Sequence, residues 1–157
     1  MIVVSDTSPL NYLVLIDFQQ ILPQLFERIL IPQAVRQELE SPATPDAIRR
    51  FLATEPEWLE TRLVSEIDPP LRQLDLGERE AIALALSTSA SRLLVDEKRG
   101  RDAARANGLS VAGTLAVLDL GARRGLLDLS VALERLEKTT FRVSPRLLRY
   151  VREGRPR

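Results

Sequence analysis

The sequence contains neither cysteine nor histidine. Without cysteine, the chain has no disulfide, no thiolate nucleophile and no Cys-ligated zinc site. Without histidine, it lacks the usual general base near neutral pH and the usual ligand of transition metals. Any catalysis must therefore rely on carboxylates, lysine, serine or threonine, or on a metal ion that is held by oxygen atoms. Oxygen ligands alone point to Mg²⁺ or Mn²⁺ as the cofactor.

Long apolar runs are also missing. None reaches the roughly 18 residues that a membrane span requires, so no membrane partner is expected. The opening residues, Met1 to Asp6, lack the basic segment that begins a signal peptide. With 45% hydrophobic and 28% charged residues, the composition is that of an ordinary globular protein. We therefore expect a cytoplasmic protein with a single domain over residues 1–157.

The formal net charge of zero hides an uneven distribution. Residues 1–80 hold 7 Lys and Arg against 14 Asp and Glu, whereas residues 81–157 hold 15 against 8. The last part of the chain, from about residue 138, is strongly basic and predicts a helix followed by a tail. Such a segment can contact phosphates or an acidic partner, or it can be a solvated helix surface. The sequence leaves both interpretations open.

Short apolar runs alternate with segments of helical periodicity along the chain. The runs are short and several are rich in β-branched residues, which is typical of buried strands. This alternation predicts an α/β fold, a three-layer α/β/α sandwich with a mainly parallel central sheet. The expected strands cover residues 2–4, 28–31, 58–64, 93–95 and 109–111.

Two acids follow expected strands directly. Asp6 comes after the first apolar run and Asp96 comes after the run 93–95. In parallel sheets, the loops at the carboxyl ends of the strands converge on one crevice, so these two carboxylates are expected at the same edge. Asp6 can also be explained as the N-cap of the following helix, and this segment alone does not exclude that reading.

Two further acids come from helices. Glu38 lies near the end of a predicted helix, where a negative charge opposes the helix dipole, which hints at a tertiary role for Glu38 or Glu40. The helix from Glu78 offers Glu78 and Glu80, which lie about 200° apart around the axis and cannot easily share one site. Because Ala83 and Leu84 follow Glu80 at helical spacing, we expect Glu80 to face inward and Glu78 to face solvent.

Together these carboxylates predict one acidic pocket, formed by Asp6, Glu38, Glu80 and Asp96. Crowded carboxylates repel one another unless a cation compensates their charge. A divalent metal ion supplies that charge and can activate water, and phosphodiester hydrolysis is the reaction that most often uses such a site. The cationic side chains beside Asp96 fit phosphate binding, although they can equally be surface charges of a helix: Lys98, Arg99 and Arg101.

Several segments resemble the PIN-domain nucleases, and most closely their uncharacterised prokaryotic relatives of VapC-type toxins. The resemblance covers about residues 2 to 127 and is carried by four segments in the family's order. These are Val3–Leu10, Ile31–Leu39, Leu76–Ala85 and Leu93–Arg101, with 108–118 behind them.

The resemblance implies a role for each acid. Asp6 matches the family's first acid, Glu38 the second, Glu80 the helix acid and Asp96 the last, with Glu97 as the substitute for Asp96. Asp6, Glu80 and Asp96 are the implied metal ligands, although typical toxins carry Asp where this chain has Glu80.

The function that the resemblance implies is a Mg²⁺- or Mn²⁺-dependent endoribonuclease. In such families the enzyme is commonly the toxin of a toxin–antitoxin pair, commonly dimeric, and its partners are RNA and a small antitoxin protein. The alternative is a non-catalytic PIN-like module that binds RNA or a protein and has lost its affinity for metal.

Overall fold

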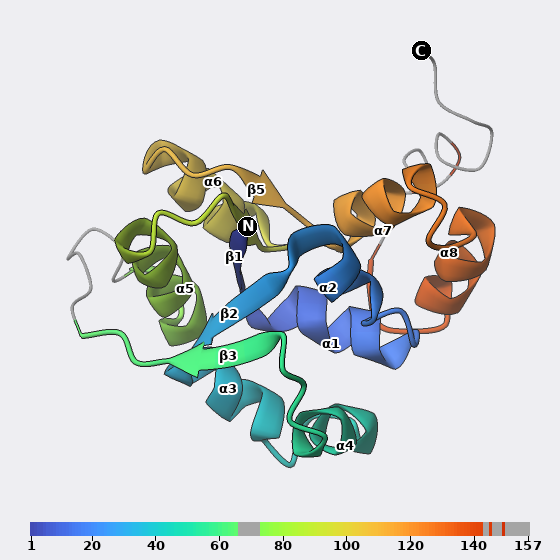
Figure 1. The fold of residues 1–157 in the computed structure, drawn as a ribbon, viewed down its shortest axis with the longest axis horizontal. Helices are drawn as coiled ribbons and strands as arrows, with labels where there is room; N and C mark the ends of the chain where they lie inside the picture. The colour runs from blue at the N-terminus through green and yellow to red at the C-terminus, as the bar shows by residue number, and fades with distance from the viewer. Residues whose placement is uncertain (66–72, 143–144, 146–148, 150–157) are drawn as a thin grey trace.

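The structure is a computed structural model that describes residues 1–65, 73–142, 145 and 149. Five short strands form one sheet in which every neighbouring pair is parallel, in the order β3-β2-β1-β4-β5 (Figure 1). The predicted parallel α/β sheet is therefore confirmed. The strands are β1 (Ile2–Ser5), β2 (Arg28–Pro32), β3 (Leu59–Arg62), β4 (Arg92–Leu94) and β5 (Val111–Ala112).

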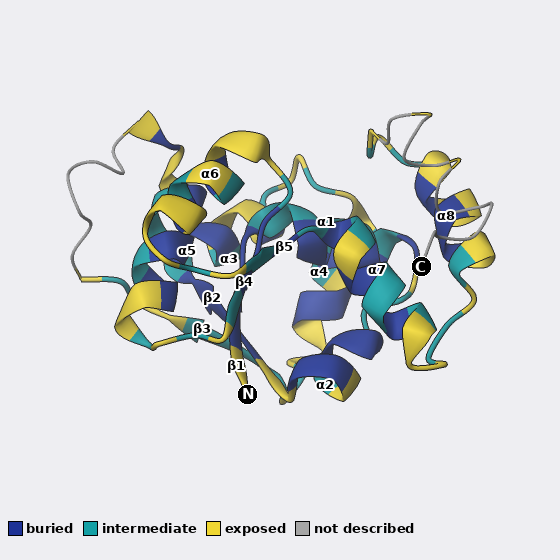
Figure 2. Cartoon of the chain, turned by 90° about the horizontal axis from the view of Figure 1, so that it is seen from above, coloured by how far each residue is buried: buried dark blue, intermediate teal, exposed yellow. Residues whose placement is uncertain are grey.

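Alternating side chains of the strands build a separate core on each face of the sheet. Val3 and Ile29 point to one face, whereas Val4 and Leu30 point to the other, and all four are at most 1% exposed. Burial on both faces explains why the strands are almost continuously apolar. The described helices cover both faces and complete three layers, as Figure 2 shows from above.

The two helical layers differ in size. On the Val4 face lie α5 (Leu76–Ser87) and α6 (Lys98–Ala106). The larger core on the Val3 face is closed by α1 (Thr7–Leu15), α2 (Ile21–Phe26), α3 (Gln33–Glu40), α4 (Asp46–Ala53), α7 (Thr114–Arg123) and α8 (Leu129–Glu137).

Several strands have boundaries that differ from the predicted ones. The strand predicted over 58–64 is limited to Leu59–Arg62, and the one predicted over 109–111 is Val111–Ala112. The latter starts late because Leu109 donates its N–H to Ala104 in the last turn of α6, which Gly108 leaves with a positive φ of 81°. The predicted basic helix and tail from about residue 138 fall mostly outside the described residues. Within the described part of the chain, every helix is too short or too polar to span a bilayer.

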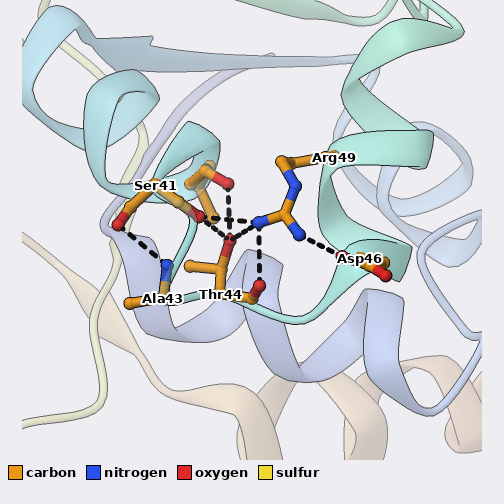
Figure 3. A network of polar contacts seen from close by, with 6 residues as sticks. Ser41, Ala43, Thr44, Asp46 and Arg49 are labelled. Atoms are coloured by element: carbon orange, nitrogen blue, oxygen red, sulfur yellow. Dashed lines mark hydrogen bonds and ion pairs between the residues drawn. The ribbon is translucent and has the colours of Figure 1, made fainter.

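A polar network closes the loop between α3 and α4 (Figure 3). Arg49 donates to the carbonyl oxygens of Ser41, at 2.7 Å, and Thr44, at 2.8 Å, and it pairs with Asp46. The Thr44 hydroxyl in turn donates to the carbonyl of Leu39, at 3.0 Å. These bonds satisfy carbonyls that the end of α3 leaves without helical partners, and so hold the end of the helix that carries Glu38.

Replacing Arg49 with alanine is expected to lower the free energy of unfolding by about 1–3 kcal/mol, because the partly buried Thr44 carbonyl loses its donor and the pair with Asp46 is lost. Urea unfolding measures the change. Arg50→Ala is the matched control, since Arg50 is the next residue of the same helix and is exposed. Equal losses in the two variants would contradict a specific role for Arg49.

Candidate active site

Asp6 lies in the loop between β1 and α1, at the carboxyl edge of the sheet. It is only 8% exposed. Although it occupies the N-cap position of α1 with an extended backbone, its side chain makes no capping hydrogen bond. Helix capping therefore does not explain this buried carboxylate.

Glu38 meets Asp6 at the start of α5. A Cβ atom built on Gly77 would lie 2.7 Å from Oε1 of Glu38 and 3.4 Å from Oδ1 of Asp6. The other oxygen of Glu38 accepts a hydrogen bond of 2.5 Å from the Thr7 hydroxyl. The structure thus brings these two predicted acids together, from α3 and from the end of β1, against a glycine that leaves them the space.

The prediction that Glu78 faces solvent is wrong, and Glu80, which was predicted to be the inward acid, is the less buried of the two. Glu78 is 5% exposed, and its Oε2 atom is buried with no hydrogen-bond partner among the described residues. Glu80 is less buried, and its Oε1 accepts a 3.0 Å hydrogen bond from the backbone N–H of Ala34, in the first turn of α3. Glu80 therefore links α5 to α3, and Glu78 is the glutamate of this helix that lies with Asp6.

Glu78, and not Glu80, is the more buried glutamate because of the position at which α5 begins. Asp75 is its N-cap and forms a capping box with Glu78, in which Asp75 Oδ1 accepts from the Glu78 N–H at 2.9 Å. Two signals for this arrangement are present in the sequence. One is the spacing of Asp75 and Glu78, and the other is that Ala81 and Ile82, which follow Glu78 at helical spacing, are each 1% exposed.

Burial and crowding raise the pKa of both buried acids. The pKa of Asp6 rises to about 7, mainly because burial penalises the charged form, with further contributions from the charges of Asp75, Glu38 and Glu97. The backbone N–H of Thr7 acts in the opposite direction.

The pKa of Glu78 also rises to about 7. The largest cause is again burial, followed by its hydrogen bond with Asp75 and by the charges of Asp75, Asp6 and Glu97. Two neighbouring carboxyl groups that resist ionisation in this way form a site that attracts a cation or a proton.

Asp96 is engaged through both of its carboxylate oxygens. Its Oδ1 accepts from the Thr114 N–H at 2.6 Å, and its Oδ2 accepts from the hydroxyls of Thr114 and Ser8, each at 2.7 Å. These contacts join the loop after β4 to the starts of α7 and α1. They occupy both carboxylate oxygens of Asp96, and the sequence did not reveal them.

The charge of Glu97 acts on the two buried acids, Asp6 and Glu78. Glu97 occupies the N-cap position of α6 without making a capping hydrogen bond, and it is exposed. Its charge raises the pKa of both Asp6 and Glu78. The residue that the sequence offered as a substitute for Asp96 is therefore the one that acts on the two buried acids.

Gly100 has the same role toward Glu78 as Gly77 has toward Glu38. A Cβ atom at Gly100 would lie 2.6 Å from Oε2 of Glu78 and 2.9 Å from Cγ2 of Val95. Only a residue without a side chain lets α6 pack this closely against the buried carboxylate. Sequence reasoning missed both glycines because nothing local marks them: each lies inside a helix and has ordinary helical surroundings.

The three predicted cations lie on the first turn of α6. Lys98 is exposed and pairs with Asp102 at 2.8 Å, one helical turn away. Arg99 is exposed and donates to the carbonyl of Gln73 at 2.9 Å, and Arg101 donates to the carbonyl of Asp96. Arg101 thus supports the loop after β4, whereas Lys98 and Arg99 remain accessible to a ligand.

The donor set suits a hard divalent cation. The buried Glu78 oxygen without a partner, the raised pKa of Asp6 and the all-oxygen chemistry of the cluster fit Mg²⁺ or Mn²⁺. Among the described residues, however, no three acids already converge as a group that could hold a metal ion. A third ligand would therefore have to come from an exposed acid, either Glu38, which already lies beside Asp6, or Glu97.

Comparisons with known proteins agree with this fold. A PilT N-terminus domain protein, SSO1118, from the hyperthermophilic archaeon Sulfolobus solfataricus P2 has a similar structure, with a TM-score of 0.53. The likeness covers 91% of this chain and all of that chain at 15% identity, so it speaks for the fold alone. Among curated proteins, none matches this chain significantly. A family profile described as PIN domain (DUF3368) matches residues 2–154, and the chain therefore belongs to the PIN domain family.

Proposed function

We propose that this protein is a metal-dependent endoribonuclease that hydrolyses RNA phosphodiester bonds with Mg²⁺ or Mn²⁺. The PIN domain family generally comprises nucleases, which act on nucleic acid. The observation that carries the proposal is the buried Glu78 oxygen without a hydrogen-bond donor, beside the buried Asp6. A buried carboxylate is costly unless it is paired or coordinates a metal ion, and this one has no partner in the described part of the chain.

The proposed metal ligands are Asp6 and Glu78, with Glu38 and Glu97 completing the site. This set keeps Asp6 and Glu38 of the sequence prediction. It replaces Glu80, one oxygen of which accepts from the Ala34 N–H, and Asp96, both oxygens of which accept from Thr114. A bound divalent ion would neutralise the clustered charge, steady a phosphate oxygen and activate water. Within the protein, the Thr7 hydroxyl orients Glu38 through its 2.5 Å hydrogen bond.

Substrate contacts are assigned to the first turn of α6. Lys98 and Arg99 are exposed immediately after Glu97, which supports a role for them in binding the phosphates of an RNA strand. Arg101 belongs to the predicted set but supports the Asp96 carbonyl, so we assign it the smaller share of phosphate binding.

The finer biological role rests on the resemblance of the four sequence segments. By that resemblance the protein is the toxin of a toxin–antitoxin pair, acts in the cytoplasm, forms a homodimer and is inhibited by a small antitoxin protein. A second candidate function, a non-catalytic module that binds RNA or protein, is favoured by one observation. No three described acids are grouped to hold a metal ion as they stand.

Thermal unfolding and cleavage of a labelled single-stranded RNA, each with Mn²⁺ and with EDTA, test the proposal. A ligand at about 100 times its dissociation constant adds about 2.7 kcal/mol to the free energy of unfolding. Mn²⁺ is therefore expected to raise the midpoint temperature of thermal unfolding. RNA cleavage is expected with Mn²⁺ and not with EDTA. RNA binding with neither Mn²⁺-induced stabilisation nor cleavage would establish the second candidate instead.

A further inference from the structure

β3 is the end strand of the sheet, and no other strand in the described part of the chain pairs with its outer edge. Figure 1 shows β3 at the near side of the sheet with β2 behind it. Ile29 donates its N–H to the carbonyl of Trp58, so residues 58, 60 and 62 direct their backbone groups to β2. The N–H and C=O of Thr61 then point outward, and no described backbone group bonds to them, whereas the N–H of Leu59 is donated to the carbonyl of Pro56 at 3.1 Å. An open edge of this kind is a template for another strand.

The sequence along this edge is complementary to itself. It reads Leu59-Glu60-Thr61-Arg62-Leu63, which is apolar, acidic, neutral, basic and apolar. If a second copy pairs with it antiparallel about a two-fold axis at Thr61, each Glu60 faces Arg62 of the second copy, and each Leu59 faces Leu63 of the second copy. A two-fold interface requires this kind of match between a surface and itself.

The direction of the backbone groups strengthens the match. Thr61 points its N–H and C=O outward, so Thr61 and its copy would form a hydrogen-bonded pair. Glu60 and Arg62 of the second copy would then be a non-hydrogen-bonded pair, in which opposing Cα atoms lie only about 4.5 Å apart. Cross-strand side chains interact most closely at such positions, and opposite charges there are favourable.

Within one chain, the same charges have only weak partners. Glu60 accepts from Arg28 at 2.9 Å and from Arg62 at 3.3 Å, with all three side chains at least 36% exposed. Exposed pairs of this kind contribute little, so they do not compete strongly with a cross-strand pair.

The edge also ends in an apolar side chain that is exposed to solvent. Leu63 is 82% exposed, more than any other large hydrophobic residue described. A hollow of about 390 Å³ lies beside the first half of β3, where Leu59 and Thr61 help to line it. Leu63 of a second copy would lie opposite Leu59, at the mouth of this hollow.

From these features we propose that the open edge of β3 is a homodimer interface, in which two copies pair antiparallel about Thr61 and join their sheets into one. Pairing of five residues is small beside a standard interface of about 1,600 Å². The expected dimer is therefore weak and concentration-dependent. The assignment rests on the chemistry of this edge and not on the nuclease site, so either can fail without the other.

Sedimentation equilibrium on the full chain and on charge variants tests the interface. Glu60→Arg places Arg opposite Arg62 of the second copy, and Arg62→Glu places Glu opposite Glu60 of the second copy. Each single change is expected to raise the dimer dissociation constant about tenfold or more, because two attractive pairs become two repulsive ones. The double variant restores opposite charges and is expected to return to within about threefold of wild type.

Thr61→Pro is a backbone test of the same surface. Proline removes the outward N–H of Thr61, which a strand at a sheet edge tolerates, and the dimer is expected to be lost. Thr61→Val, which keeps that N–H, is the matched control and is expected to dimerise, and circular dichroism checks that each variant is folded. A wild-type monomer at every concentration, or a dimer that none of these changes weakens, overturns the proposal.

Discussion

Asp6→Asn is expected to lose metal-dependent RNA cleavage while the metal-free protein becomes more stable above neutral pH. The cleavage loss is expected to be on the order of 1,000-fold, because the site loses a charged ligand that is placed against Glu38 and lies beside Glu78. The gain in stability follows from the pKa of about 7 for the buried Asp6 carboxyl.

The sign of the stability change follows from proton linkage. In the unfolded chain the pKa of Asp6 is near its ordinary value of 3.8, and in the folded protein it is about 7. Between these values the folded state holds the proton more tightly, so its stability falls as the pH rises from about 4 to about 7. Ionised Asp6 then costs up to about 4 kcal/mol at pH 8. Asparagine does not ionise, so it removes this cost.

Urea unfolding of wild type and Asp6→Asn in EDTA, at pH 4 and at pH 8, measures this effect. The two proteins are expected to be similar at the lower pH, and the variant is expected to be more stable at the higher one. With Mn²⁺, wild type is expected to regain stability while the variant gains little. If Asp6→Asn is no more stable at pH 8 and still cleaves RNA, Asp6 is not the buried acid of a metal site.

The second large expected effect is a difference in RNA cleavage between variants of Glu78 and of Glu80. Glu78→Gln is expected to reduce cleavage about 100-fold or more, because it removes the charge of the buried carboxylate while keeping its shape. Glutamine at this position still completes the capping box with Asp75, so the helix start is preserved. The loss therefore reports on the site and not on folding.

Glu80→Gln is the matched control, two residues further along the same helix. The glutamine oxygen still accepts from the Ala34 N–H, so cleavage is expected to stay within a few-fold of wild type. Cleavage rates in Mn²⁺, with urea unfolding as the check on folding, compare the two variants. A larger loss in Glu80→Gln than in Glu78→Gln would return the metal site to the residue that helical spacing favoured.

Much of the fold follows from local pattern. The strand runs that contain Val3, Leu30 and Leu93 are apolar because both faces of a parallel sheet are buried, and this property can be read along the chain. The boundaries of the short edge strands β3 and β5 could not be read in the same way. Their ends depend on neighbouring strands and on the end of α6, as the hydrogen bond from Leu109 to Ala104 shows.

The acids of the site also differ in how far their surroundings could be predicted from the sequence. Asp6 and Glu38 were predicted from their positions at the end of a strand and the end of a helix, and the structure brings them together at Gly77. Glu80 was predicted from helical spacing and Asp96 from its position after a strand, but one oxygen of Glu80 and both oxygens of Asp96 accept hydrogen bonds from other elements. Spacing gives the relative angle of two side chains on a helix, and it does not give the direction in which the helix faces.

By itself, the sequence determined the chemistry that is available, an oxygen-only site without His or Cys, and a parallel sheet whose carboxyl edge collects Asp6. Only the tertiary structure decided which acids share that edge. The N-cap Asp75 sets the phase of α5, and the close approach of Gly100 buries Glu78 beneath α6. The physical reason is that burial and charge crowding depend on contacts between elements that are far apart in the chain, and local periodicity contains no information on them.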